Sequence, residues 1–349
     1  MIEFDPDQIE HEAIRAHYQR VNRRGVAMAR AIAETFPDRP PVRFVFEEGD
    51  SFNAFAGREE RGYLLRMAKP VPYLLLILFD RLLGDPRLLP WLDSQGEAFT
   101  EYELPFVLDP ADFSRRGRWS IRLTGIRSFA SSMLADIAIA FIQMHELGHV
   151  LCGHVDANQA LTGRHAMAEI YDKGGGRSRA QSARERIWES DADAVAAGLL
   201  EQYLRELEAA TQTDDKTRQV FGRGEHAIEH LLALAIMSLF ALFAYIRGAR
   251  YSLRRQTSHP HPYLRAQYTK NMLMTVARRA WPLDLDAFGE FLDLRIDEML
   301  TALEAVGLSK NELFDDAYIA RSERQLDVLM KKRTKYRSSA STRSWIFWD

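Results

Sequence analysis

The sequence predicts an α+β fold that is mostly helical, with a small β-sheet placed before a long central helix. Apolar residues recur at three- and four-residue intervals through residues 128–152, which is the spacing of a buried helix. Apolar and charged side chains alternate in residues 42–46, which indicates a strand. Helical spacing returns in residues 181–207 and again after Asp284, so helices are expected to outweigh strands.

The N-terminal part is expected to be one helix followed by strands. Residues from about 7 to 36 are rich in Ala, Arg and Glu, and the prolines of 37–41 cannot continue a helix. After the strand at 42–46, a turn at Glu48-Gly49-Asp50 leads to a second strand at 52–56. Residues 71–79 are a continuous apolar run, and periodicity alone assigns it neither to a buried strand nor to a helix.

The central helix carries the most informative side chains. Its apolar stripe, which includes Leu134 and Phe141, continues directly into His145 and His149. Gly153 supplies a helix stop. The two histidines are therefore expected on the buried face of this helix.

A second helix of interest is expected at residues 181–207. It follows a predicted mobile loop at 172–179 that contains three consecutive glycines. Glu189 and Asp193 lie one turn apart on this helix. They share one side of it with the apolar residues Ala197, Leu200 and Leu204.

The C-terminal half contains an apolar run at 231–246, interrupted only by Ser238. A membrane-spanning helix needs about 20 such residues, so a buried core helix is favoured and membrane contact is the alternative. The predicted organisation is an N-terminal helix at 1–41, a core region at 42–270, a helical region at 271–332 and a basic, Ser-rich tail at 333–349 that ends in aromatic residues.

Length, net charge and cysteine content limit the kinds of protein and the compartments that are expected for this chain. The chain of 349 residues is 46% hydrophobic, enough for a sizeable core, and its net charge of -3 gives no field that would attract nucleic acid. A single cysteine, Cys152, excludes an internal disulfide framework and favours a reducing compartment, so a cytoplasmic location is expected. Residues 1–12 lack the basic start and apolar run of a secretory signal peptide.

The segment His145-Glu146-Leu147-Gly148-His149 has the His-Glu-x-x-His spacing of many zinc enzymes. Residues four apart share one face of a helix, so both imidazoles can bind one Zn²⁺ while Glu146 lies beside it. There Glu146 can take a proton from the attacking water and pass it to the leaving amine. The alternative is an exposed helix that carries the two histidines by chance. The motif continues an apolar stripe, however, so these side chains are expected to be buried, and burying two imidazoles and a carboxylate without a partner would be costly.

Catalytic zinc usually takes three protein ligands and leaves a fourth position for water. The metzincin pattern would need a histidine at the position of Val155, so that class is excluded. Glu189 is the favoured third ligand, with Asp193 accepting a ring proton from a ligand histidine. A solvated acidic helix face is the alternative interpretation of that segment. His154 is interpreted as a residue that supports the site rather than as a ligand.

Together these residues resemble the gluzincin metallopeptidases typified by HtpX and the CAAX prenyl protease. The zinc helix followed by Gly153-His154 is similar to the family's zinc helix, and residues 189–193 are similar to its Glu-x-x-Ala-Asp element. Residues 51–56 are similar to its Asn-Ala-Phe-Ala segment, and Ser258-His259-Pro260 with Arg265 to its later His-Pro and Arg element. The similar segments span roughly residues 52–265.

The resemblance implies a zincin-like metallopeptidase core, Zn²⁺ as cofactor, and hydrolysis of peptide bonds in a protein or peptide substrate. It also implies that Glu189 joins His145 and His149 as the third ligand. A regulatory or binding protein with a purely structural zinc site is the alternative function. Because family members usually carry membrane spans, a membrane-associated protease held through 231–246 is a further alternative.

The resemblance also implies substrate contacts and catalytic support. An edge strand before the zinc helix is expected to bind the substrate in extended form, through Asn53, Ala54, Phe55 and Ala56. His259 and Arg265 are expected to support the active site, where a donor could stabilise the oxyanion of the tetrahedral intermediate. A rigid surface connector, held extended by its prolines, is the alternative interpretation of residues 259–263.

Overall fold

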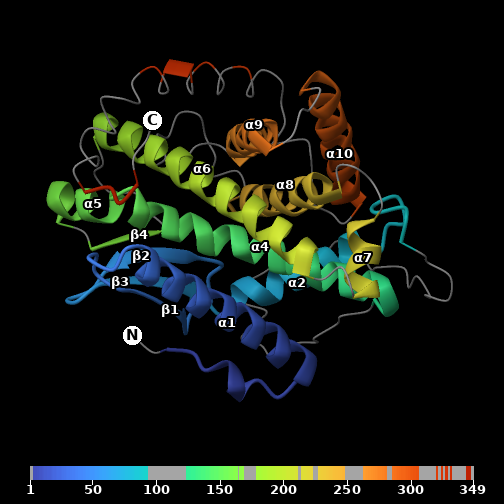
Figure 1. The fold of residues 1–349 in the computed structure, drawn as a ribbon, viewed down its shortest axis with the longest axis horizontal. Coiled ribbons are helices and arrows are strands. Elements are labelled where there is room, and N and C mark those ends of the chain that lie inside the picture. The colour runs from blue at the N-terminus through green and yellow to red at the C-terminus, as the bar shows by residue number, and fades with distance from the viewer. Residues whose placement is uncertain are drawn as a thin grey trace.

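The computed structural model describes residues 3–92, 123–163, 165–168, 178–210, 214–222, 227–247, 262–280, 285–305 and 343–346, with isolated positions between 320 and 331. In the described residues, helices predominate and a small sheet precedes the long central helix in the chain (Figure 1). The predicted α+β fold is therefore confirmed.

The sheet is built from four short strands, β1 (Val42–Glu47), β2 (Ala54–Arg58), β3 (Tyr63–Ala68) and β4 (Ala166–Ala168), in the order β1-β3-β2-β4. β3 lies between the two predicted strands, parallel to β1 and antiparallel to β2. β4 comes from a segment after the central helix and pairs antiparallel with β2, with Ala56 opposite Met167. The strands predicted at 42–46 and 52–56 are confirmed, whereas β3 and β4 were not predicted.

Helices form the other elements. Before the sheet are η1 (Pro6–Gln8) and α1 (Glu12–Thr35); after β3 come α2 (Pro70–Leu82), α4 (Gly125–Leu151), α5 (His154–Thr162), α6 (Arg179–Ala210), α7 (Asp215–Phe221), α8 (Ala227–Arg247), α9 (Pro262–Ala280) and α10 (Leu285–Ala305). The helices predicted at 7–36, 128–152 and 181–207 correspond to α1, α4 and α6. Residues 172–177 of the predicted loop and most of the predicted tail lie outside the described residues.

The ambiguous run at 71–79 forms α2. Pro70 and Pro72 stand in its first turn, where the missing N–H costs no intrahelical hydrogen bond. Nearly every residue of α2 is buried, because the helix packs against both α1 and α4. A helix buried on all sides shows no helical period in its sequence, which explains why periodicity could not assign it.

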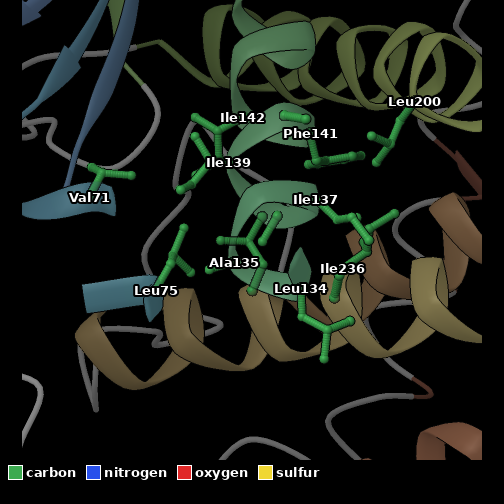
Figure 2. Close-up of a cluster of buried hydrophobic side chains, with 14 of the residues drawn as sticks. Val71, Leu75, Leu134, Ala135, Ile137, Ile139, Phe141, Ile142, Leu200 and Ile236 are labelled. Atoms are coloured by element: carbon green, nitrogen blue, oxygen red, sulfur yellow. The ribbon is translucent and has the colours of Figure 1, made fainter. Parts of the chain in front are cut away.

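The hydrophobic core is centred on α4, whose side chains point toward helices on several sides (Figure 2). One side of α4 faces Val71 and Leu75 of α2, and another faces Leu200 of α6 and Ile236 of α8. The same cluster of buried residues also includes Ile14 of α1 and residues of α10. The predicted N-terminal and C-terminal helical regions therefore share one core with residues 42–270.

The apolar run at 231–246 lies within α8, which packs against α4, α9 and α10. Two described helices, α4 and α8, are long and apolar enough to cross a membrane, but a buried core helix meets the same criterion. In α8, 94% of the most apolar window is buried by the rest of the protein. The predicted core helix is confirmed.

Candidate metal centre

The predicted ligands come from α4 and α6, which pack at very close range. A Cβ added at Gly148 would lie 3.0 Å from both the Cα and the backbone oxygen of Ala192. A glycine on α4 opposite a small residue on α6 lets the two backbones approach. This approach brings Glu189 of α6 opposite His145 and His149 of α4.

Three side chains, His145, His149 and Glu189, converge on one point. The Nε2 atoms of the two histidines are 3.1 Å apart. They lie 3.4 Å and 3.5 Å, respectively, from the two carboxylate oxygens of Glu189. A tetrahedral zinc site with bonds of about 2.0–2.1 Å has ligand atoms about 3.3 Å apart, so this spacing fits such a site.

All three side chains are buried, with exposed fractions of 1% to 3%. Burying two imidazoles and a carboxylate is costly unless they are paired or bind a metal. Among the described residues this is a group whose ligand atoms all lie within 4.8 Å of one another and could hold a metal ion. The predicted convergence of these three residues is confirmed.

The ring of His145 is held from its other side by a buried ion pair. His145 Nδ1 lies 2.8 Å from Asp193 Oδ1, so Nδ1–H donates to the carboxylate and the Nε2 lone pair faces the ligand group. Arg265 of α9 donates to both oxygens of Asp193, at 2.9 Å and 2.8 Å. Burial alone would raise the pKa of Asp193, but the Arg265 charge and hydrogen bonds from His145 and Arg265 hold it below its usual value.

The ring of His149 is contacted by a third histidine. His149 Nδ1 lies 3.1 Å from Nδ1 of His154, at the start of α5. Because His149 directs Nε2 toward the ligand group, its Nδ1–H donates and His154 Nδ1 accepts. His154 therefore lies on the far side of the His149 ring from the ligand group. Its predicted role as a residue that supports the site stays a prediction. Its own ring stacks on Trp188 of α6, with centroids 5.2 Å apart and planes 14° apart.

Glu146 follows His145 on α4 and is 2% exposed. Consecutive helix residues point about 100° apart, so the Glu146 side chain leaves α4 in a different direction from that of His145. Glu146 is not a member of the candidate metal-binding group of the described residues.

The strand predicted to bind substrate is not at the edge of the sheet. Residues 53–56 lead into β2, which pairs with β3 on one side and with β4 on the other. Among the described strands, β2 is therefore internal because residues 166–168 pair outside it, whereas β1 is the strand before the zinc helix that lies at an edge of the sheet. Substrate contact through residues 53–56 stays a prediction. Asn53, Ala54 and Ala56 are buried, and Phe55 alone of the predicted four is partly exposed.

Of the two residues expected to support catalysis, His259 lies outside the described residues. Arg265 is buried, and its guanidinium lies 5.0 Å and 5.6 Å from the ring centroids of Phe240 and Phe243. Its link to the metal centre runs through Asp193. Trp188 has no signal in the sequence, because a residue directly before Glu189 does not share its helix face.

Comparison with known proteins gave no relative: no protein-family model, no curated protein and no solved structure matches the chain. The class of protein is therefore defined by the site alone. It is a protein with a buried His-His-Glu group, on two closely packed helices, that could hold a metal ion.

Proposed function

We propose that this protein is a zinc-dependent endopeptidase that hydrolyses peptide bonds of a protein substrate. The observation that carries the proposal is the convergence of His145, His149 and Glu189, with Glu146 next to them in a His-Glu-x-x-His helix. Two imidazole nitrogens and one carboxylate oxygen are the donor set of several catalytic zinc sites. The ligand spacing of 3.1 to 3.5 Å supports the same metal.

The described residues offer three ligands, which leaves a fourth position for water or substrate. Zinc at this place would act as a Lewis acid on the substrate carbonyl and would acidify water. Glu146 would accept the proton of the attacking water and deliver it to the leaving amine. Asp193 and His154 would keep the two imidazole rings in the tautomer and orientation that metal binding needs.

The alternative of a purely structural zinc site is less well supported. Structural zinc is almost always closed by four protein ligands, whereas the candidate group in the described part of the chain has three. A structural site also needs no proton acceptor, yet the buried Glu146 directly follows the ligand His145 in the chain. As part of the same proposal we place the protein in the cytoplasm, because a chain with a single cysteine suits a reducing compartment.

The test is Glu146→Gln, compared with wild type and with the control Glu201→Gln. Glu201 is a buried glutamate of α6 that pairs with Arg205, away from the ligand group. Glu146→Gln is expected to keep stoichiometric zinc but to lose cleavage, because the ligands remain and the proton acceptor is gone.

Zinc content is measured on the purified proteins, and cleavage by proteomic comparison of new protein termini in cells expressing each form. Termini that appear with wild type and Glu201→Gln but not with Glu146→Gln support the proposal. The same termini in the Glu146→Gln cells would refute it. Zinc binding without any new termini would leave a structural or regulatory metal site as the better account.

A further inference from the structure

The C-terminal segment, residues 343–346, docks on the end of the helix that carries the metal ligands. The backbone N–H of Trp345 donates to the carbonyl of Leu151 at 2.8 Å, and the Ser344 hydroxyl lies 3.1 Å from the same oxygen. Leu151 is the last residue of α4, where carbonyl groups have no partner within the helix. The segment therefore acts as a cap on α4.

The side chain of Trp345 anchors this segment. It is 6% exposed and packs edge to face against Phe36 and Tyr63, at centroid distances of 5.7 Å and 5.5 Å. The Arg39 guanidinium lies 5.9 Å from its ring centroid and also donates to the Ser344 carbonyl at 3.3 Å. A buried tryptophan with aromatic and cationic neighbours is a strong anchor for a short segment.

The segment also lies directly on the turn between α4 and α5. Gly153 in this turn has φ +73°, and a Cβ there would come within 2.6 Å of the Arg343 carbonyl carbon. No side chain fits at this position while the segment is docked. Figure 1 shows the red C-terminal segment beside α5.

Gly153 immediately precedes His154, whose Nδ1 accepts from the Nδ1–H of His149. A second contact also links the segment to α5. Trp345 packs on Tyr63, and the Tyr63 hydroxyl donates to Asp156 of α5 at 2.5 Å. The C-terminal segment thus contacts the α4–α5 turn, which directly precedes His154, and Tyr63 of β3, which hydrogen-bonds to α5.

We propose that residues 343–346 are a positioning element of the metal centre: they hold the α4–α5 turn so that His154 orients the ligand His149. The inference rests on the proposed metal site. Trp345 acts through His154 and touches no ligand, so its effect is on zinc affinity. Release of this segment loosens zinc, which makes docking of the C-terminal segment a means of regulating the enzyme.

The test measures zinc affinity by competition with a chelator, for wild type, Trp345→Ala, His154→Ala and the double variant. His154→Ala is expected to weaken zinc binding by about 10–100-fold, the usual effect of removing a group that orients a ligand. Trp345→Ala is expected to weaken it by roughly tenfold. In the His154→Ala background, Trp345→Ala should add almost nothing, because the two act through one contact.

The matched control is Trp91→Ala. Trp91 also anchors a loop, by donating from Nε1 to the Val220 carbonyl at 3.2 Å and packing on His230, but its neighbours in α7 and α8 carry no part of the metal centre. Trp91→Ala should leave zinc affinity unchanged. If Trp345→Ala does not fold, Arg39→Ala, which removes an exposed contact of the same segment, should lower affinity in the same direction.

The outcomes separate this inference from the proposed function. Zinc affinity that is unchanged in Trp345→Ala, or a loss that is additive with His154→Ala, overturns the inference alone. A wild-type protein that binds zinc but cleaves nothing overturns the peptidase and leaves the positioning element intact. A wild-type protein that binds no zinc overturns both.

Discussion

At the scale of single residues, Glu189 and Asp193 stand one turn apart on α6 and have different contacts. Glu189 lies close to the Nε2 atoms of both ligand histidines. Of these two histidines, Asp193 contacts only His145, at Nδ1. Glu189→Ala should therefore release zinc almost completely. Asp193→Ala should lower affinity by only about 10–100-fold, because an orienting partner is lost and the ligand remains.

The measurement is zinc content after dialysis of both variants against the same weak chelator. Glu189→Ala should retain far less zinc than Asp193→Ala. Stoichiometric zinc in Glu189→Ala would mean that another residue completes the site, and the gluzincin interpretation would fail.

Arg265 and Asp193 form a fully buried ion pair, with both side chains 1% exposed. Arg265→Met should destabilise the protein by about 3–5 kcal/mol, because it leaves the Asp193 carboxylate buried without its cation. Arg30→Met is the control, since Arg30 pairs with Glu34 on the exposed face of α1 and such pairs contribute about 0.5 kcal/mol or less. Urea unfolding of the metal-free proteins measures the loss of unfolding free energy in both variants. Equal midpoints for the two variants would contradict this assignment of the buried pair.

The candidate site could be predicted from the sequence where its residues are linked by helical spacing. His145 and His149 are four residues apart with Glu146 directly after the first, and Glu189 and Asp193 are also four residues apart. Each group can therefore be recognised from the spacing within one helix. The pairing of Asp193 with Arg265, which are 72 residues apart, comes from helix packing and has no local signature. The contact of His154 with His149 depends on a left-handed glycine at 153, which places α5 against the end of α4.

At the scale of elements, the close contact of α4 with α6 sets the geometry of the site. Gly148→Ala is expected to push the backbone of α6 away from α4, because the new Cβ would lie 3.0 Å from Ala192 backbone atoms. The expected cost is about 1–3 kcal/mol in stability, together with weaker zinc binding. Urea unfolding and chelator competition measure the two effects.

The control for that variant is Gly198→Ala, also in a helix. A Cβ at Gly198 meets nothing within 4 Å, so the substitution should stabilise α6 by up to about 1 kcal/mol and leave zinc affinity unchanged. If Gly148→Ala has the same unfolding free energy and the same zinc affinity as wild type, the contact between α4 and α6 does not set the geometry of the site.

The sequence predicted the elements with a clear period and missed those that depend on tertiary pairing. β3 is buried at nearly every position, so it has no alternation to detect. β4 is only three residues long and exists because it pairs with β2. Because β4 pairs with β2, the strand that was expected at the edge of the sheet lies inside it.

At the scale of the whole molecule, α1 is joined to the core by a buried histidine. His17 Nε2 lies 3.3 Å from the Pro72 carbonyl of α2, and its Nδ1 lies 3.2 Å from an Arg20 nitrogen. The neutral ring satisfies both contacts, with Nε2–H donating and Nδ1 accepting. Burial lowers the pKa of His17 from 6.5 to about 4, although Asp136 opposes that shift and Arg20 and Arg24 add to it.

This pKa makes stability depend on pH in a defined window. Between pH 6.5 and 4 the unfolded chain binds a proton at His17 that the folded protein does not, so stability falls as the pH falls. The loss attributable to His17 at pH 5 is about 2 kcal/mol. His17→Gln should remove that part of the difference in unfolding free energy between pH 7 and pH 5, measured in urea on metal-free protein so that zinc release does not contribute. The control is His11→Gln, because His11 is exposed and lies just before α1. This variant should keep the wild-type difference in unfolding free energy between pH 7 and pH 5. If the two variants show the same difference, the buried neutral state of His17 is refuted.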